Sequence, residues 1–193
     1  TGRVSEKPVD GVTYGMAEYA AAEELGRFTG MWWSPDSRTL YFTRVDDRTL
    51  PRVALLEDAE LNHRYTIQRY PMVAAPLAEV SLNQWDGETG TVSSFPLPGT
   101  GERYLARLVH LQDRPVLIIL TRNQRELDIY EISEPSTPRL LHRETDNQWI
   151  NLFDMFRWMP DTGSLLWQTE SPGDTCLVSL PLENGRFRNL TPG

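Results

Sequence analysis

Residues 33 to 42 read WSPDSRTLYF, and this stretch decides the fold. Ser-Pro-Asp-Ser is a strong turn signal, because proline fixes one backbone angle and the polar side chains can bond the backbone around it. The residues from Thr39 to Val45 that follow are rich in β-branched and aromatic side chains, which favour a strand. The stretch therefore predicts a turn followed by a buried strand.

The same pattern recurs 125 residues later, at position 158 against position 33. Residues 158 to 167 read WMPDTGSLLW and align with the first stretch without a gap. Residues 109 to 122 read VHLQDRPVLIILTR and form a looser third copy. Repetition of this kind is the sequence signature of a fold built from similar structural units.

Each copy is followed by two further apolar runs. The second runs are residues 78–85, 127–132 and 175–180, and the third runs are 92–97, 139–142 and 186–190. This unit of three strands joined by turns repeats roughly every 45 to 50 residues. That spacing is typical of four-stranded propeller blades. The first unit is longer because residues 46–76 are inserted.

We therefore predict an all-β fold, a β-propeller fragment of about three to four four-stranded blades. Residues 1–31 would form the end of a preceding blade and a short helix, 32–99 a blade with an insertion, and 100–148 and 149–193 two further blades. A closed ring needs at least about four blades, so the chain would hold part of a ring. A β-sandwich of short strands would not predict the gapless repeat.

The composition argues against several classes of partner and site. The net charge of −8, from 27 acids against 19 bases, argues against a nucleic-acid groove. Cys176 is the only cysteine, which excludes an intrachain disulfide and a cysteine metal cluster. The longest apolar run, about five residues, is far short of the roughly 20 that cross a bilayer. We expect no metal, cofactor, nucleic-acid or membrane partner.

The best candidates for chemistry are the adjacent acids Glu23 and Glu24. An ammonium group has three donors and no acceptor, so two neighbouring carboxylates can accept two of its hydrogen bonds. Taken alone, such a pair is also what a solvated helix face looks like. The sequence has no G-x-S-x-G, so a hydrolase nucleophile elbow is absent, and His63, His110 and His142 receive no role. No catalytic residue is expected in this chain.

Residues 23 to 33 read EELGRFTGMWW, which closely resembles the glutamate-pair segment of the dipeptidyl peptidase IV family, especially its bacterial and cytosolic branches. Four later segments are similar to the family in the same order: TRVDD at 43–47, QRYP at 68–71, NQWINL at 147–152 and LTPG at 190–193. Two departures affect local loops: MVAAP follows Arg-Tyr-Pro where the family has Lys-Ala-Gly, and Phe153 stands where some relatives have histidine.

The resemblance implies an eight-bladed propeller over an α/β-hydrolase domain that this sequence does not contain. Such enzymes are serine peptidases that release dipeptides from free peptide N-termini, usually after a penultimate Pro or Ala. In the family the glutamate pair holds the substrate's free α-amine, and the resemblance assigns this role to Glu23 and Glu24. The expected partners are such peptides and the hydrolase domain of the same parent chain, and the fragment alone is predicted to be inactive. A bacterial cytoplasm or periplasm is the expected compartment.

Phe153 and Arg27 are open to two interpretations each, and the two tryptophans have a preferred one. Phe153 would line a side-chain subsite near the amine, or be a buried blade residue. Arg27 would be an ion-pair partner that orients the acids, or a surface arginine. Trp32 and Trp33 are better explained as core than as ligand contacts.

The resemblance and the composition also differ on the helix. Composition favours a helix from Gly15 to Leu25, whereas the resemblance places a strand near Tyr19 and a short helix from Glu23 to Phe28. We follow the resemblance, because tertiary context overrides propensity in short segments.

Two other functions remain open. The chain could be a stand-alone propeller that serves as a protein-interaction module without peptidase activity. It could also belong to an acylaminoacyl or oligopeptidase-type enzyme, which would not need the acid pair. Open edge strands would favour a homodimer.

Overall fold

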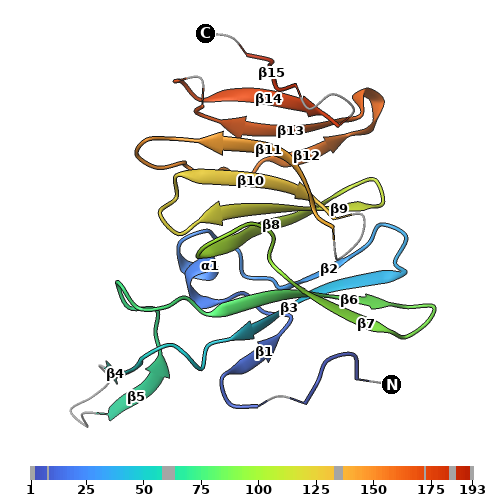
Figure 1. The fold of residues 1–193 in the computed structure, drawn as a ribbon. Helices are drawn as coiled ribbons and strands as arrows, with labels where there is room; N and C mark the ends of the chain where they lie inside the picture. The colour runs from blue at the N-terminus through green and yellow to red at the C-terminus, as the bar shows by residue number, and fades with distance from the viewer. Residues whose placement is uncertain are drawn as a thin grey trace.

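The computed structural model describes residues 3–7, 9–57, 64–132, 137–171, 173–182 and 186–191. Three antiparallel sheets lie one on the next in chain order, from the N-terminal sheet to the C-terminal one (Figure 1). A two-stranded hairpin projects from the first sheet, and a short helix lies beside the first and second sheets. The predicted all-β class is confirmed.

The strands of each sheet follow the chain closely. The first sheet has the order β1-β3-β6-β7, with β2 also on β3: β1 Val12–Tyr14, β2 Met31–Trp33, β3 Thr39–Asp46, β6 Glu79–Asp86 and β7 Val92–Pro96. The second has β8 Arg103–Leu111, β9 Arg114–Thr121, β10 Glu126–Glu131 and β11 Arg139–Thr145, in consecutive order. The third has β12 Phe156–Met159, β13 Ser164–Thr169, β14 Cys176–Pro181 and β15 Arg188–Asn189, again in consecutive order.

The repeat seen in the sequence is also a repeat of strand pairing. Trp33 pairs with Leu40 across β2 and β3, and Trp158 pairs with Leu165 across β12 and β13. In both sheets the Trp begins the turn, and in the first sheet Asp36 closes it by accepting hydrogen bonds from the Ser34 hydroxyl and the Arg38 amide. The alignment therefore predicts the register as well as the strands.

Two apolar cores hold the sheets together, and β9 contributes to both. Val116, Ile118 and Leu120 lie in the core that includes the third sheet, whereas Leu117 and Ile119 lie in the core shared with the first sheet. Both faces of β9 are covered, which explains its uninterrupted apolar sequence.

Strand β8 contains a β-bulge between Leu105 and Arg107. Leu105 and Leu108 both lie in the core shared with the first sheet, although they are three residues apart. A regular strand alternates its side chains with period two and would send them to opposite faces. The additional residue, Ala106, removes this conflict and itself packs in the other core.

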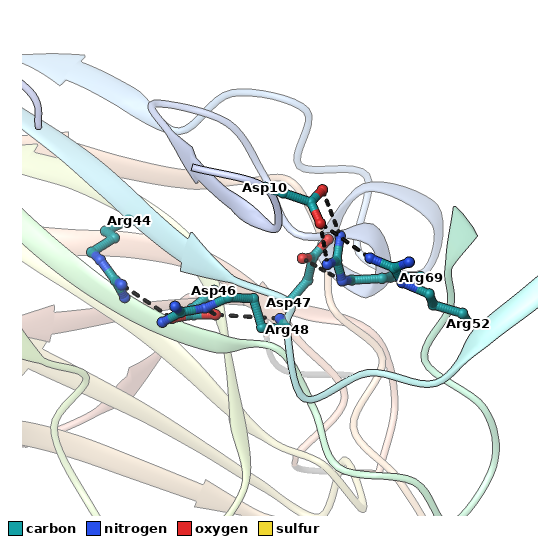
Figure 2. A network of polar contacts seen from close by, with 7 residues as sticks. All are labelled: Asp10, Arg44, Asp46, Asp47, Arg48, Arg52 and Arg69. Atoms are coloured by element: carbon teal, nitrogen blue, oxygen red, sulfur yellow. Dashed lines mark hydrogen bonds and ion pairs between the residues drawn. The ribbon is translucent and has the colours of Figure 1, made fainter. Parts of the chain in front are cut away.

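The insertion forms a hairpin of β4 Arg52–Glu57 and β5 Arg64–Arg69. A polar network fastens its base to the first sheet (Figure 2). Asp10 accepts hydrogen bonds from Arg69, at 2.7 and 3.1 Å, and from Arg52 at 3.1 Å, and Arg69 also reaches Asp47 at 3.5 Å. The network places the residues that follow Arg69 beside the first sheet.

Nearby, Asp46 binds two further guanidinium groups. Arg48 lies 2.5 Å and Arg44 3.0 Å from Asp46 Oδ2 (Figure 2). The hydrogen bonds from Arg48 hold the pKa of Asp46 far below its ordinary value, against an opposing effect of burial. This carboxylate therefore stays ionised well below the ordinary pKa of an aspartate, and its ion pairs with Arg44 and Arg48 lie at the end of β3.

One aromatic prediction is corrected. Trp32 packs against the core between the first two sheets, but Trp33 is 53% exposed. Its ring packs edge-on against Trp85, with centroids 6.1 Å apart, on the outer side of the first sheet.

Among the described residues, no helix is long and apolar enough to cross a membrane. His63, Pro192 and Gly193 lie outside the described residues.

Candidate functional site

The helix beside the acids, α1, runs from Tyr19 to Glu23 and ends at Glu24. Gly26 ends it, because its φ of +65° is a left-handed conformation that glycine adopts without strain. The amides of Glu24 and Arg27 donate to the carbonyls of Ala20 and Ala21. The expected helix from Glu23 to Phe28 and the strand near Tyr19 are therefore wrong; the composition of Gly15 to Leu25 indicated the helix better.

The two acids lie at the carboxyl end of α1, where the helix presents its free carbonyl groups. Glu23 and Glu24 are both exposed, whereas Ala21 and Leu25 are buried in the core. The carboxyl end of a helix carries negative partial charge and favours a cation. Two carboxylates there break the usual rule for helix ends, and such local conflicts are typical of functional sites. The arrangement attracts a positively charged group.

The segment around α1 is a loop with a closed base. Met16 and Thr29 form an isolated bridge, and the buried Thr43 hydroxyl donates to the carbonyl of Met16 at 2.6 Å. A Cβ on Gly30 would lie 2.3 Å from Thr43 Oγ1 and 2.5 Å from the backbone of Met16, so only glycine fits there. The loop therefore starts and ends at a fixed place on β3.

Arg27 is not a surface residue. It is 4% exposed, and its guanidinium lies 2.5 Å from Glu18, the residue that precedes α1. The same group donates to the carbonyls of Thr29, at 2.7 Å, and Leu105, at 2.8 Å. The expected ion pair exists, but its partner is Glu18 and not either of the acids. No sequence signal marks a pair nine positions apart across a turn.

Glu24 lines a hollow of about 580 Å³ between α1, the segment after the hairpin and the second sheet. Its aromatic walls are Tyr19, Tyr70 and Tyr104. The rings of Tyr19 and Tyr70 lie 4.9 Å apart, and Tyr70 belongs to the QRYP segment singled out in the sequence. Contact with the Tyr70 hydroxyl raises the pKa of Tyr19, with smaller contributions from burial and from Glu23 and Glu24.

The charges on the far wall of the hollow neutralise each other. Arg122 pairs with Glu102 at 2.8 Å and donates to the carbonyl of Ala75 at 2.7 Å. The Arg122 contact lowers the pKa of Glu102, which stays ionised. This leaves Glu24 as the charged lining residue that has no ion pair within the described part of the chain.

Phe153 lies apart from this hollow. It is half-buried on the loop between β11 and β12 and is not one of the residues that line the hollow around Glu24. Its neighbour Asp154 forms an ion pair with Arg107 of β8. The subsite assigned to Phe153 stays a prediction.

The described residues contain no group of three or more His, Cys, Asp or Glu side chains that could hold a metal ion. Cys176 is buried, and burial raises the pKa of its thiol. His110 and His142 pack against Tyr41 and Trp167 inside the sheets, away from the acids. What the site presents is a pair of exposed carboxylates, one of which lines an aromatic-walled hollow.

Comparisons with known proteins bear on the family and the fold. The sequence profile of the family described as "Dipeptidyl peptidase IV (DPP IV) N-terminal region" matches residues 2–193. Dipeptidyl peptidase 8 of Mus musculus is 23% identical in an alignment 193 positions long, which covers 77% of this chain and 22% of that protein.

Two solved structures share the fold. The Porphyromonas gingivalis dipeptidyl peptidase 4 superposes with a TM-score of 0.85 at 20% identity, over 98% of this chain and 28% of that one. A Bacteroides ovatus chain assigned as a dipeptidyl aminopeptidase IV superposes with a TM-score of 0.81 at 20% identity, over 98% and 30% of the two chains. This chain spans less than a third of each of these relatives.

Proposed function

Because the chain belongs to the family of dipeptidyl peptidase IV N-terminal regions, we propose that it is the substrate-recognition propeller domain of a serine dipeptidyl peptidase. In this proposal Glu23 and Glu24 bind the free α-amine of a peptide. The missing α/β-hydrolase domain of the parent chain supplies the nucleophile and cleaves after the second residue. The domain contributes binding and positioning, and is inert by itself.

The observation that carries the proposal is the place of Glu24 at the edge of an aromatic-walled hollow. Glu23 is beside it in the chain, and both acids are exposed at the end of α1. Neither acid has an ion-pair partner among the described residues. The two carboxylates are therefore available to an incoming ammonium group, and the hollow can receive the atoms attached to it.

The expected gain in binding is large enough to select substrates. Each charge-assisted hydrogen bond contributes roughly 1.5–3 kcal/mol. Two such bonds would separate a free N-terminus from a blocked one by about two to four powers of ten. Holding the first nitrogen also fixes which peptide bond reaches the nucleophile, which is catalysis by positioning.

The test uses the full-length parent enzyme. Glu23→Gln combined with Glu24→Gln should lower kcat/KM for a Gly-Pro-chromophore substrate by about 100-fold or more. Glu88→Gln is the matched control, because Glu88 is an exposed glutamate in the turn between β6 and β7 and its ion-pair partner among the described residues is the exposed Arg38. Activity of the double variant within threefold of the wild type would end the amine-binding proposal.

The rival, a protein-interaction module without peptidase activity, is separated by a second measurement. A fluorophosphonate probe should label the full-length parent chain and leave residues 1–193 alone unlabelled. An unlabelled parent chain would favour the interaction module, and labelling of the fragment would contradict its proposed inactivity.

A further inference from the structure

We propose that Arg27 is a positioning residue, which holds Glu23 and Glu24 in the orientation that binds the amine. It acts through Glu18 and through the backbone of β8, and touches no substrate itself. This inference rests on the proposed function of the two acids.

The three contacts of Arg27 join three separate parts of the fold. Nη2 lies 2.5 Å from the carboxylate of Glu18, at the start of α1. Nη1 donates to the carbonyl of Thr29, at the base of the loop, and Nε donates to the carbonyl of Leu105 in the second sheet. A planar guanidinium can serve three acceptors at fixed angles, which a lysine ammonium cannot reproduce.

The helix cannot hold the acids by itself. A helix of five residues is far below the length at which helices are stable alone. Glu18 and Arg27 bracket α1 on both sides, and Ala21 and Leu25 anchor its inner face in the core. The direction in which the exposed acids point is therefore set by these attachments.

The buried ion pair between Glu18 and Arg27 is not explained by its net contribution to stability. Glu18 and Arg27 are 6% and 4% exposed, and burial lowers the pKa of Arg27 while the charge of Glu18 opposes that change. Desolvating two charges cancels much of their attraction, so apolar side chains of equal size often stabilise a buried position as well. What apolar side chains cannot supply is a directional link from both ends of α1 to one carbonyl of β8.

The backbone carbonyl of β8 that accepts a hydrogen bond from Arg27 lies at the β-bulge. Leu105, whose carbonyl accepts from Arg27, directly precedes the additional residue Ala106. On the other side of Ala106, Arg107 pairs with Asp154, next to Phe153. The same irregularity of one strand thus anchors the acid segment and the loop that carries the predicted subsite.

The experiment compares Arg27→Lys with Arg143→Lys in the full-length parent enzyme. Arg143 is the control for the loss of an arginine ion pair, because its half-exposed side chain makes a two-pronged ion pair with the buried Asp128, at 2.6 and 2.8 Å, on β10 and β11. Arg27→Lys should raise KM for a Gly-Pro-chromophore substrate about tenfold and leave kcat within about threefold. Arg143→Lys should leave both constants within about twofold.

A double-mutant cycle separates positioning from general destabilisation. In a background that carries Glu23→Gln and Glu24→Gln, Arg27→Lys should change kcat/KM less than about twofold, because no acids remain to be misplaced. An equal loss in both backgrounds, or no loss in either, would overturn the inference. If the lysine variant does not fold, Glu18→Gln takes its place, with the same pattern at about threefold.

Hydrogen exchange gives a readout that does not need amine binding. The amides of residues 19–25 should exchange about tenfold faster in Arg27→Lys than in the wild type. In Arg143→Lys their exchange rates should equal those of the wild type. If the variant with both Glu23→Gln and Glu24→Gln keeps its activity, the proposed function fails. The hydrogen-exchange measurement then still decides whether Arg27 fixes residues 19–25. Unchanged exchange would refute the positioning role.

Discussion

Tyr19 and Tyr70 lie ring against ring, with centroids 4.9 Å apart, although Tyr19 begins α1 and Tyr70 follows β5. The contact joins the acid segment to the base of the inserted hairpin. Arg69, one residue earlier, is fixed by Asp10 and Asp47 (Figure 2). The insertion is thus part of the wall of the candidate site and not only an appendage of the first sheet.

Tyr70→Ala should weaken substrate binding in the parent enzyme. Paired aromatic rings contribute about 0.5–1.5 kcal/mol beyond the area they bury, so KM for a Gly-Pro-chromophore substrate should rise about two- to tenfold. Tyr70→Phe keeps the ring and should stay near the wild type. Steady-state kinetics check both variants, and an equal effect of the two would contradict a role for the ring contact.

Ile118→Ala should be among the most destabilising substitutions in the chain. Ile118 is 0% exposed on β9 inside the core that includes the third sheet, and such truncations cost about 2–5 kcal/mol. Leu56→Ala is the control, because Leu56 is 68% exposed on the hairpin and should change stability by about 0.5 kcal/mol or less. Denaturant unfolding measures the difference, and a similar midpoint for both variants would contradict the assignment of the core.

Glu144→Gln should stabilise the chain at neutral pH. Burial raises the pKa of Glu144 above its ordinary value of 4.5, against a lowering by the hydroxyl of Thr169, which donates to it. The folded state therefore prefers the protonated acid, so the contribution of this group to stability is complete below pH 4.5 and is lost as the pH rises through the raised pKa. Glutamine removes this loss and still accepts the hydrogen bond. Thermal unfolding should show a gain at pH 7 that disappears below about pH 4; a gain at every pH would count against this cause.

Replacing His142 by phenylalanine should weaken the acid sensitivity of the fold. Burial lowers the pKa of His142 below 6.5, because the ring packs against both Trp167 and Phe187. The neutral ring favours folding, so its contribution is complete above pH 6.5 and is lost as the pH falls through the lowered pKa. His142→Phe should reduce the loss of melting temperature between pH 7 and pH 5. His110, whose pKa burial also lowers, should account for a further part, and the double variant tests this.

The strands could be predicted because their causes are local. The turn at Ser34 to Ser37 and the strand after it recur at a constant offset, and the pairs Trp33–Leu40 and Trp158–Leu165 repeat the same register. The continuous apolar run of β9 likewise indicates a strand covered on both faces. Patterns of period two and fixed spacing carry this information without reference to the rest of the fold.

The site could be predicted only in part because its attachments are distant in the sequence. Glu23 and Glu24 are marked by their neighbours, but the partner of Arg27 lies across a turn and its carbonyl acceptor lies on another sheet. The resemblance places the helix from Glu23 to Phe28, whereas the helix precedes the acids and Gly26, in a left-handed conformation, follows its end; composition indicates this better. The exposed Trp33 shows that aromatic character does not determine which side of a strand is covered.

The surplus residue in β8 has a genetic consequence. Removing Ala106 would straighten the strand and turn Leu105 or Leu108 out of its core, and the carbonyl that receives Arg27 would rotate with it. A three-base deletion at that codon would therefore change the attachment of the segment that carries Glu23 and Glu24, although no side chain in that segment had changed. The orientation of the acid segment therefore depends on the number of residues in β8 as well as on the side chains around α1.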